Sequence, residues 1–162
     1  MIIDFHTHAF PDKIAERTIQ ILSSASNDIP YADGTVNGLI ELMNKGKVDL
    51  SVCLPVMTKP SQFQSLNRFA IEVNEQKRGI LSFGGIHPLC DNIPEKMRFL
   101  KNNGLKGVKI HPDYQDTFIN DPNYIKILNE AKELDMVVVT HAGVDNGYPN
   151  TAVKCPPELA LD

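Results

Sequence analysis

The sequence has no excess of basic residues. It contains 16 Lys and Arg against 20 Asp and Glu, which gives a formal net charge of −4, and the basic residues form no run. Domains that bind nucleic acid usually concentrate Lys and Arg on one face or along one helix. The composition therefore argues against nucleic acid as a partner.

Long apolar runs are also missing. No stretch approaches the roughly 20 apolar residues that a membrane-spanning helix requires. The first residues show no charged segment followed by an apolar one, which is the pattern of a signal peptide. We therefore expect no membrane partner and a cytoplasmic location.

Cysteine is scarce, and Cys53, Cys90 and Cys155 are the only three. Their odd number and wide spacing exclude a closed disulfide framework and a Cys-x-x-Cys metal site. Reduced thiols in a cytoplasmic protein are the simplest interpretation.

Strand and helix patterns alternate along the whole chain. Strand-like stretches are expected at residues 2–8, 48–56, 80–87, 108–111 and 136–141. Helical spacing of apolar residues lies between them, at residues 12–24, 35–45, 60–77, 94–103 and 122–134, with another helical start at 156–161. Asp121 followed by Pro122 marks the start of the last long helix. Strands separated by helices of this length indicate parallel βα units.

Two architectures fit parallel βα units. An open doubly wound sheet usually carries Gly-x-Gly-x-x-Gly after its first strand, whereas this chain has His-x-His there. A closed (β/α)8 barrel has eight strands and typically about 250 residues. We therefore predict an α/β fold, a TIM-type (β/α)8 barrel. Residues 1–162 would be the N-terminal part of one such domain, covering about the first five βα units.

Three histidines are placed to meet at one end of such a barrel. His6 and His8 are two positions apart at the end of the first strand, so both side chains are expected on one face. His141 ends the fifth predicted strand, and the C-terminal ends of barrel strands converge. Three imidazoles with an open position form a catalytic type of zinc site. We predict His6, His8 and His141 as metal ligands, with Zn²⁺ the expected ion and Mn²⁺, Fe²⁺ or Co²⁺ also compatible.

Other polar residues are expected near the same place. Lys109 and His111 are two positions apart on the fourth strand and are expected on one face, where they would contact substrate. Alternatively, His111 would stabilise the following loop. A lysine beside a metal could also be carboxylated and bridge two ions. Asp4 is expected on the face of the first two histidines, where it would orient a ligand or join a polar network. For His87, which also ends a strand, a structural role is favoured.

Three segments resemble the metal-dependent amidohydrolase superfamily: IDFHTHAFP at 3–11, GVKIHP at 107–112 and VTHAG at 139–143. The branch that includes aminocarboxymuconate semialdehyde decarboxylase and related hydrolases is the most similar. The polymerase-and-histidinol-phosphatase family also begins with Asp-x-His-x-His, but its usual Ser-Asp-Gly element is absent here, where residues 9–13 read AFPDK.

The resemblance implies that His6, His8 and His141 bind one metal. It also implies a histidine at the end of a sixth strand and an aspartate, the general base, at the end of an eighth. By sequence, Asp145 follows His141 too closely to take that place, and Asp162 is the last residue. The catalytic residues are therefore expected beyond Asp162, and the 162-residue chain alone is expected to be inactive.

The resemblance implies a hydrolase whose metal-activated water attacks a carbonyl. The expected bond is an amide, a lactone or a related C–N or C–O bond in a small, carboxylated substrate. A non-oxidative decarboxylase of an aromatic or muconate-like acid would use the same ligands and is the alternative. A metal-binding fragment without activity is the second alternative. An open sheet edge and apolar helix faces favour association, so we expect a homo-oligomer.

Overall fold

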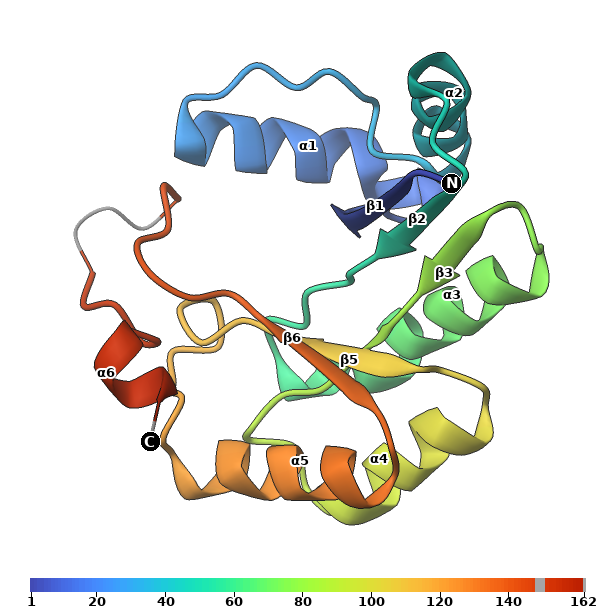
Figure 1. Cartoon of the computed structure of the whole chain (residues 1–162). Helices are drawn as coiled ribbons and strands as arrows, with labels where there is room; N and C mark the ends of the chain where they lie inside the picture. The colour runs from blue at the N-terminus through green and yellow to red at the C-terminus, as the bar shows by residue number, and fades with distance from the viewer. Residues whose placement is uncertain (148–150, 162) are drawn as a thin grey trace.

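The strands form two three-stranded parallel sheets that follow one another along a curve, with helices around their outside (Figure 1). This is a computed structural model, and it describes residues 1–147 and 151–161. The strands are β1 (Ile3–Thr7), β2 (Leu50–Cys53), β3 (Ile80–Ser82), β4 (Gly84–Gly85), β5 (Gly107–Ile110) and β6 (Val137–Thr140). Every pair of neighbouring strands is parallel, which confirms the predicted βα organisation.

The predicted strand 80–87 is divided into β3 and β4. β3 pairs with β2, whereas β4 pairs with β5. Between them, the backbone N–H of Phe83 donates to the carbonyl of Cys53 at 2.9 Å, so the chain stays attached to β2 as it changes partner. The Phe83 ring lies where a side chain at Gly107 would be, and only glycine permits this close approach.

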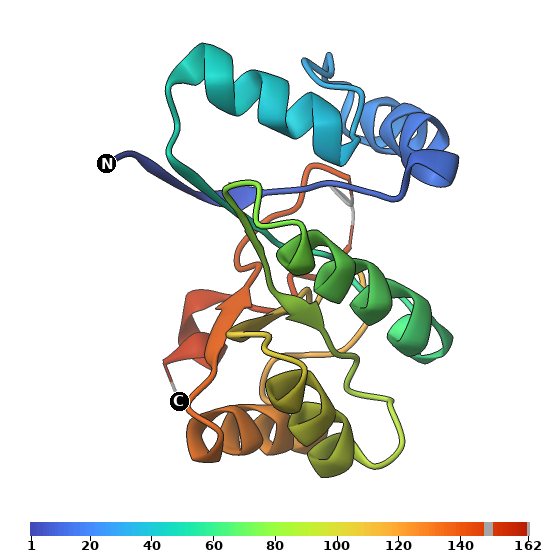
Figure 2. The ribbon, with the colours of Figure 1, turned by 90° about the vertical axis from the view of Figure 1, so that its right-hand side faces the viewer.

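The helices cover the outer side of the strands. They are α1 (Asp12–Ser26), α2 (Val36–Gly46), α3 (Phe63–Glu75), α4 (Ile93–Asn102), α5 (Pro122–Glu133) and α6 (Pro157–Ala160), and a 3₁₀ turn, η1 (Pro60–Gln62), precedes α3. Figure 2 shows α1 and α2 at one end of the row of strands, α4 and α5 at the other, and α3 between them. As predicted, Asp121 caps α5, where its carboxylate accepts from the N–H of Asn123 at 2.8 Å.

The largest apolar core lies beneath α3, α4 and α5. Val108 and Ile110 of β5 pack there against residues such as Met97, Tyr124 and Ile127. A smaller cluster of Val52, Leu54 and Phe83, joined by Leu81 and Val139, lies on the inner side of the strands.

The sheet is covered at its centre and open at both ends. All four residues of β5 are buried, whereas Ile3 and Phe5 of β1 and Val137 of β6 are about half exposed. Within the described residues, no helix has the length and apolar character needed to cross a membrane.

Candidate metal centre

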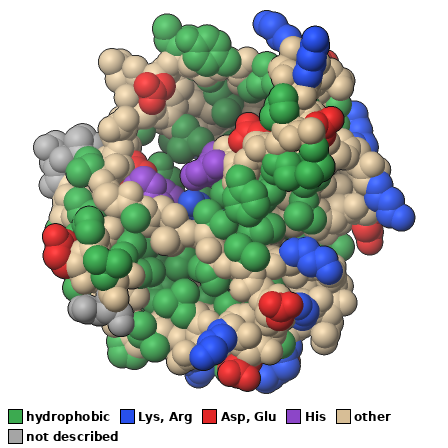
Figure 3. All heavy atoms as spheres, in the orientation of Figure 1, with side chains coloured by type: hydrophobic (Ala, Val, Ile, Leu, Met, Phe, Trp, Pro, Cys, Tyr) green, Lys and Arg blue, Asp and Glu red, His purple; other side chains and the backbone are tan. Residues whose placement is uncertain are grey.

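Histidines gather where the strands end. Because the strands are parallel, their C-terminal ends form one edge, which we call the mouth. His6 and His8 lie at the end of β1, His111 follows β5 and His141 follows β6. Figure 3 shows histidine side chains around an opening in the surface.

His6 and His8 form a pair, as predicted. Their ring centroids are 5.1 Å apart. Nδ1 of His8 lies 2.8 Å from the carbonyl oxygen of Leu54, which can only accept a hydrogen bond. Nδ1 therefore carries the proton and Nε2 is left with a lone pair for a metal.

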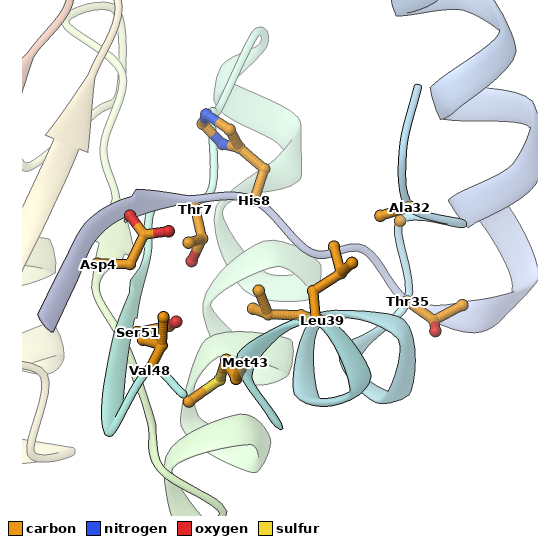
Figure 4. A pocket seen from close by; sticks show the side chains of 11 residues that line it. Asp4, Thr7, His8, Ala32, Thr35, Leu39, Met43, Val48 and Ser51 are labelled. Atoms are coloured by element: carbon orange, nitrogen blue, oxygen red, sulfur yellow. The ribbon is translucent and has the colours of Figure 1, made fainter. Parts of the chain in front are cut away.

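A β-bulge changes the expected position of Asp4. β1 has an extra residue between Asp4, which pairs with Ser51, and Thr7, which pairs with Cys53. The strand therefore does not alternate regularly between Asp4 and Thr7, and the shared face of Asp4 and the two histidines stays a prediction. The Asp4 carboxylate accepts from the backbone N–H of His6 at 3.1 Å rather than from a ring nitrogen. Asp4, Thr7 and Ser51 line a cavity of about 250 Å³ beside α2 (Figure 4).

His111, His141 and Asp145 form a second group, and their potential ligand atoms all lie within 4.8 Å of one another. Asp145 Oδ2 is 3.4 Å from Nε2 of His111 and 3.7 Å from Nε2 of His141. The two imidazoles stack at a centroid distance of 4.4 Å and an interplanar angle of 3°. Two imidazoles and a carboxylate are ligand types that Zn²⁺ and related ions accept.

Two polar atoms in or beside this group are buried without a hydrogen-bond partner: Nε2 of His141 and Oδ2 of the neighbouring Asp113. They lie 4.0 Å apart, and the Asp113 side chain is only 4% exposed. The other Asp113 oxygen accepts from the N–H of Lys154 at 3.2 Å. A buried polar atom without a partner costs about 1–3 kcal/mol. These orphaned atoms fit a bound cation, which an imidazole nitrogen and a carboxylate oxygen would both stabilise.

Asp145 lies beside His141 in space, and the expectation that it does not replace the aspartate of an eighth strand stays a prediction. The loop after β6 turns at Gly143, whose φ of +84° favours glycine. Gly143 is also fixed by an N–H bond to the carbonyl of Cys155 at 3.0 Å. This turn directs the Asp145 carboxylate back toward the imidazole of His141. A cavity of about 320 Å³ lies beside it, lined by His141, Asp145, Tyr114 and residues of α1.

Lys109 is buried on β5, with 1% of its surface exposed. Burial lowers its pKa to about 8. Its charge in turn contributes to lowering the pKa values of His6, His8 and His111. Lys109 therefore lies close to the histidines of the mouth, and contact of Lys109 or His111 with substrate stays a prediction.

The histidines of the mouth favour the neutral form. Although the His8 residue is exposed, desolvation and then the neighbouring His6 lower its pKa to about 4. Desolvation, followed by His141 and Lys109, lowers the pKa of His111 to about 3. Desolvation, and then Lys109, lowers the pKa of His6. A neutral imidazole is the form that binds a metal, so these shifts suit a metal site.

The predicted ligands thus lie at one mouth but in two groups. Within the described part of the chain, His6, His8 and His141 do not bring their ligand atoms within 4.8 Å of one another. Their joint binding of one ion stays a prediction. His87 is buried outside both groups, and its Nδ1 accepts from the N–H of Leu89 at 3.1 Å, which agrees with a structural role.

Sequence reasoning missed Asp113 and Asp145. Both lie in loops that follow strands, two and four residues after a histidine that ends its strand. Loops after barrel strands build the active-site face. Acidic residues soon after a strand-ending histidine were the available signal.

A family model described as amidohydrolase matches residues 3–160. A search of curated proteins found no significant match. The chain is similar in structure to several solved proteins and spans about half the length of each of the three compared below.

The IDCase of Metarhizium anisopliae superposes with a TM-score of 0.59 and 16% identity, over 93% of this chain and 53% of that chain. A protein described as amidohydrolase II superposes with a TM-score of 0.66 and 15% identity, over 90% of this chain and 52% of that chain. The 5-carboxyvanillate decarboxylase of Novosphingobium aromaticivorans was solved with manganese. It superposes with a TM-score of 0.65 and 11% identity, over 90% of this chain and 51% of that chain. At these identities the likeness concerns the fold.

Proposed function

Because the chain belongs to the amidohydrolase family, we propose that it forms part of a metal-dependent enzyme with its ion at the mouth. The proposed ligands are His6, His8 and His141. The observation that carries the proposal is Nε2 of His141, which is buried without a hydrogen-bond partner at an edge where four histidines gather. Zn²⁺ is the expected ion, and Mn²⁺, Fe²⁺ or Co²⁺ would also suit imidazole ligands.

When bound, such an ion lowers the pKa of a water ligand toward about 7 and polarises a carbonyl group. The residues of this chain prepare the place for it. Leu54 fixes the tautomer of His8 through its carbonyl oxygen. Asp145 Oδ2 lies 3.4 Å from Nε2 of His111 and 3.7 Å from Nε2 of His141, so its carboxylate adds negative charge next to the ring nitrogen that would bind the ion. Tyr114 and the end of α1 wall the adjoining cavity.

We propose hydrolysis of an amide, lactone or related bond in a small, carboxylated molecule. Decarboxylation of an aromatic or muconate-like acid is the second candidate, and a 5-carboxyvanillate decarboxylase is among the proteins of similar fold. Both reactions would use the same ligands. The location remains proposed as cytoplasmic, and the three free, buried thiols agree with a reducing compartment.

The experiment is a substrate screen with the protein expressed from its complete reading frame and loaded with Zn²⁺ or Mn²⁺. Carboxylated lactones are followed by base uptake on a pH-stat, and aromatic acids by release of carbon dioxide. We expect turnover of one class, lost in EDTA and reduced at least about a hundredfold by His141→Ala. Turnover that survives both treatments would contradict a metal-dependent reaction, and so would the absence of turnover in both panels.

A further inference from the structure

We propose that Lys109 is an anion-binding residue that receives the carboxylate of the substrate on the inner side of the barrel. The proposal rests on the proposed function only in taking the anion to be part of a substrate. The binding of a carboxylate by Lys109 requires no metal.

Lys109 is buried, and no counter-ion accompanies it among the described residues. Its side chain is among the largest fully buried ones of the chain. Lysine is almost never fully buried unless it is paired, because removing an ammonium group from water is costly. Among the residues that the structure describes, none forms a hydrogen bond or ion pair with the Lys109 ammonium, and burial is the one cause that shifts its pKa.

The charges around Lys109 also favour an anion. The ionisable groups that interact with Lys109 are His6, His8 and His111, which are neutral or positive. The acidic side chains near the mouth lie elsewhere: Asp145 lies against the two stacked imidazoles, Asp113 against Lys154 and His141, and Asp4, which acts on His6, lines the cavity beside α2. A divalent ion at the mouth would add further positive charge. No negative charge therefore balances Lys109 on the inner side of the strands, and a bound carboxylate would supply it.

The position of Lys109 on β5 also suits an anion-binding residue. Lys109 pairs on β6 with Val139, which packs with Phe83 on the inner side of the sheet. It also precedes His111 by two residues and so lies one step deeper than the mouth. An anion held there would be anchored beside the histidines, with apolar side chains behind it. This arrangement would orient a small acid with its carboxylate inward and the rest of the molecule toward the opening.

The test is calorimetric titration of the 162-residue chain with benzoate, using benzamide as the neutral analogue. Each titration is run on protein as purified and on protein treated with EDTA. Lys109→Met removes the charge and keeps the length of the side chain, and Lys109→Arg keeps the charge. Lys106→Met is the matched control, because Lys106 is an exposed lysine just before the other end of the same strand.

We expect benzoate to bind both preparations, with an affinity at least about tenfold weaker in Lys109→Met. Lys106→Met should bind as the wild type does, Lys109→Arg should bind more tightly than Lys109→Met, and benzamide should not bind. Equal affinity of the wild type and Lys109→Met overturns the proposal, as does a wild type that does not bind benzoate. A carbamate signal on Lys109 after incubation with isotopically labelled bicarbonate also overturns it.

The EDTA arm separates this proposal from the proposed function. Benzoate binding that is lost in EDTA and independent of Lys109 would place the carboxylate on the metal, which overturns the inference and leaves the metal site standing. Binding that depends on Lys109 in a protein that takes up no metal would support the inference and contradict the proposed function.

Discussion

Lys109→Met should stabilise the protein, because it removes a buried charge without removing the packing of the side chain. The pKa of Lys109 falls from its ordinary 10.5 to about 8 through burial. At about 1.4 kcal/mol per pH unit, the charged form costs about 3 kcal/mol of folding free energy at pH 7. The side chain is 1% exposed, so water does little to reduce this cost. Methionine fills a similar volume and is readily accommodated in apolar surroundings.

The stability gained by Lys109→Met should decrease as the pH rises. Below pH 8, Lys109 is protonated in both the folded and the unfolded chain, and the full cost is present. Between pH 8 and 10.5 the unfolded chain binds more protons than the folded one, so the stability of the wild type rises with pH. The advantage of Lys109→Met should therefore shrink across this window and disappear above it.

The assay is urea unfolding followed by far-ultraviolet circular dichroism, since the chain has no tryptophan. Measurements at pH 7, 9 and 10.5 compare the wild type with Lys109→Met and with the exposed control Lys106→Met, which should change stability by less than about 0.5 kcal/mol. A loss of about 1 kcal/mol or more in Lys109→Met at pH 7 would show that Lys109 has a favourable partner. Either this loss or a gain that does not change with pH would refute the reasoning.

Three further predictions concern the fold and its surface. All three thiols are buried and burial raises their pKa values, so a disulfide reagent at pH 8 should modify them only after denaturant is added; rapid reaction of the native chain would contradict this burial. Asp121→Ala removes the cap of α5 and should cost about 1 kcal/mol by urea unfolding, against no change in the exposed Glu133→Gln; equal stability of both would contradict the cap. The half-exposed Phe5 on the open β1 edge predicts self-association, so light scattering should show a smaller species for Phe5→Lys than for the wild type, and a monomeric wild type would exclude it.

The fold could be predicted because its signals are local and periodic. The alternation of apolar strands and amphipathic helices reflects the burial of each element, and the Asp121–Pro122 start of α5 is chemistry within a few residues. The division of the third strand at Phe83 could not be predicted in this way. It depends on which neighbour each half meets, β2 or β5, and only the assembled sheet determines that.

The site could be predicted in part for the same reason. His6 and His8 are neighbours along one strand, and the convergence of strand ends brings His111 and His141 to the same mouth. Asp145 reaches this mouth because Gly143 turns the loop and bonds to Cys155, a contact between distant parts of the chain. No spacing rule reveals such a turn. The bulge in β1, which breaks the alternation at Asp4, depends likewise on pairing with β2.

The most direct test of the metal centre is elemental analysis of the purified chain beside a His6→Ala/His8→Ala variant, with His87→Gln as the histidine control outside the site. We predict about one equivalent of zinc or a similar divalent ion in the wild type and in His87→Gln, and loss of that ion in the double variant. No bound metal in the wild type, or equal metal in the wild type and the double variant, would contradict the assignment of His6 and His8 as ligands.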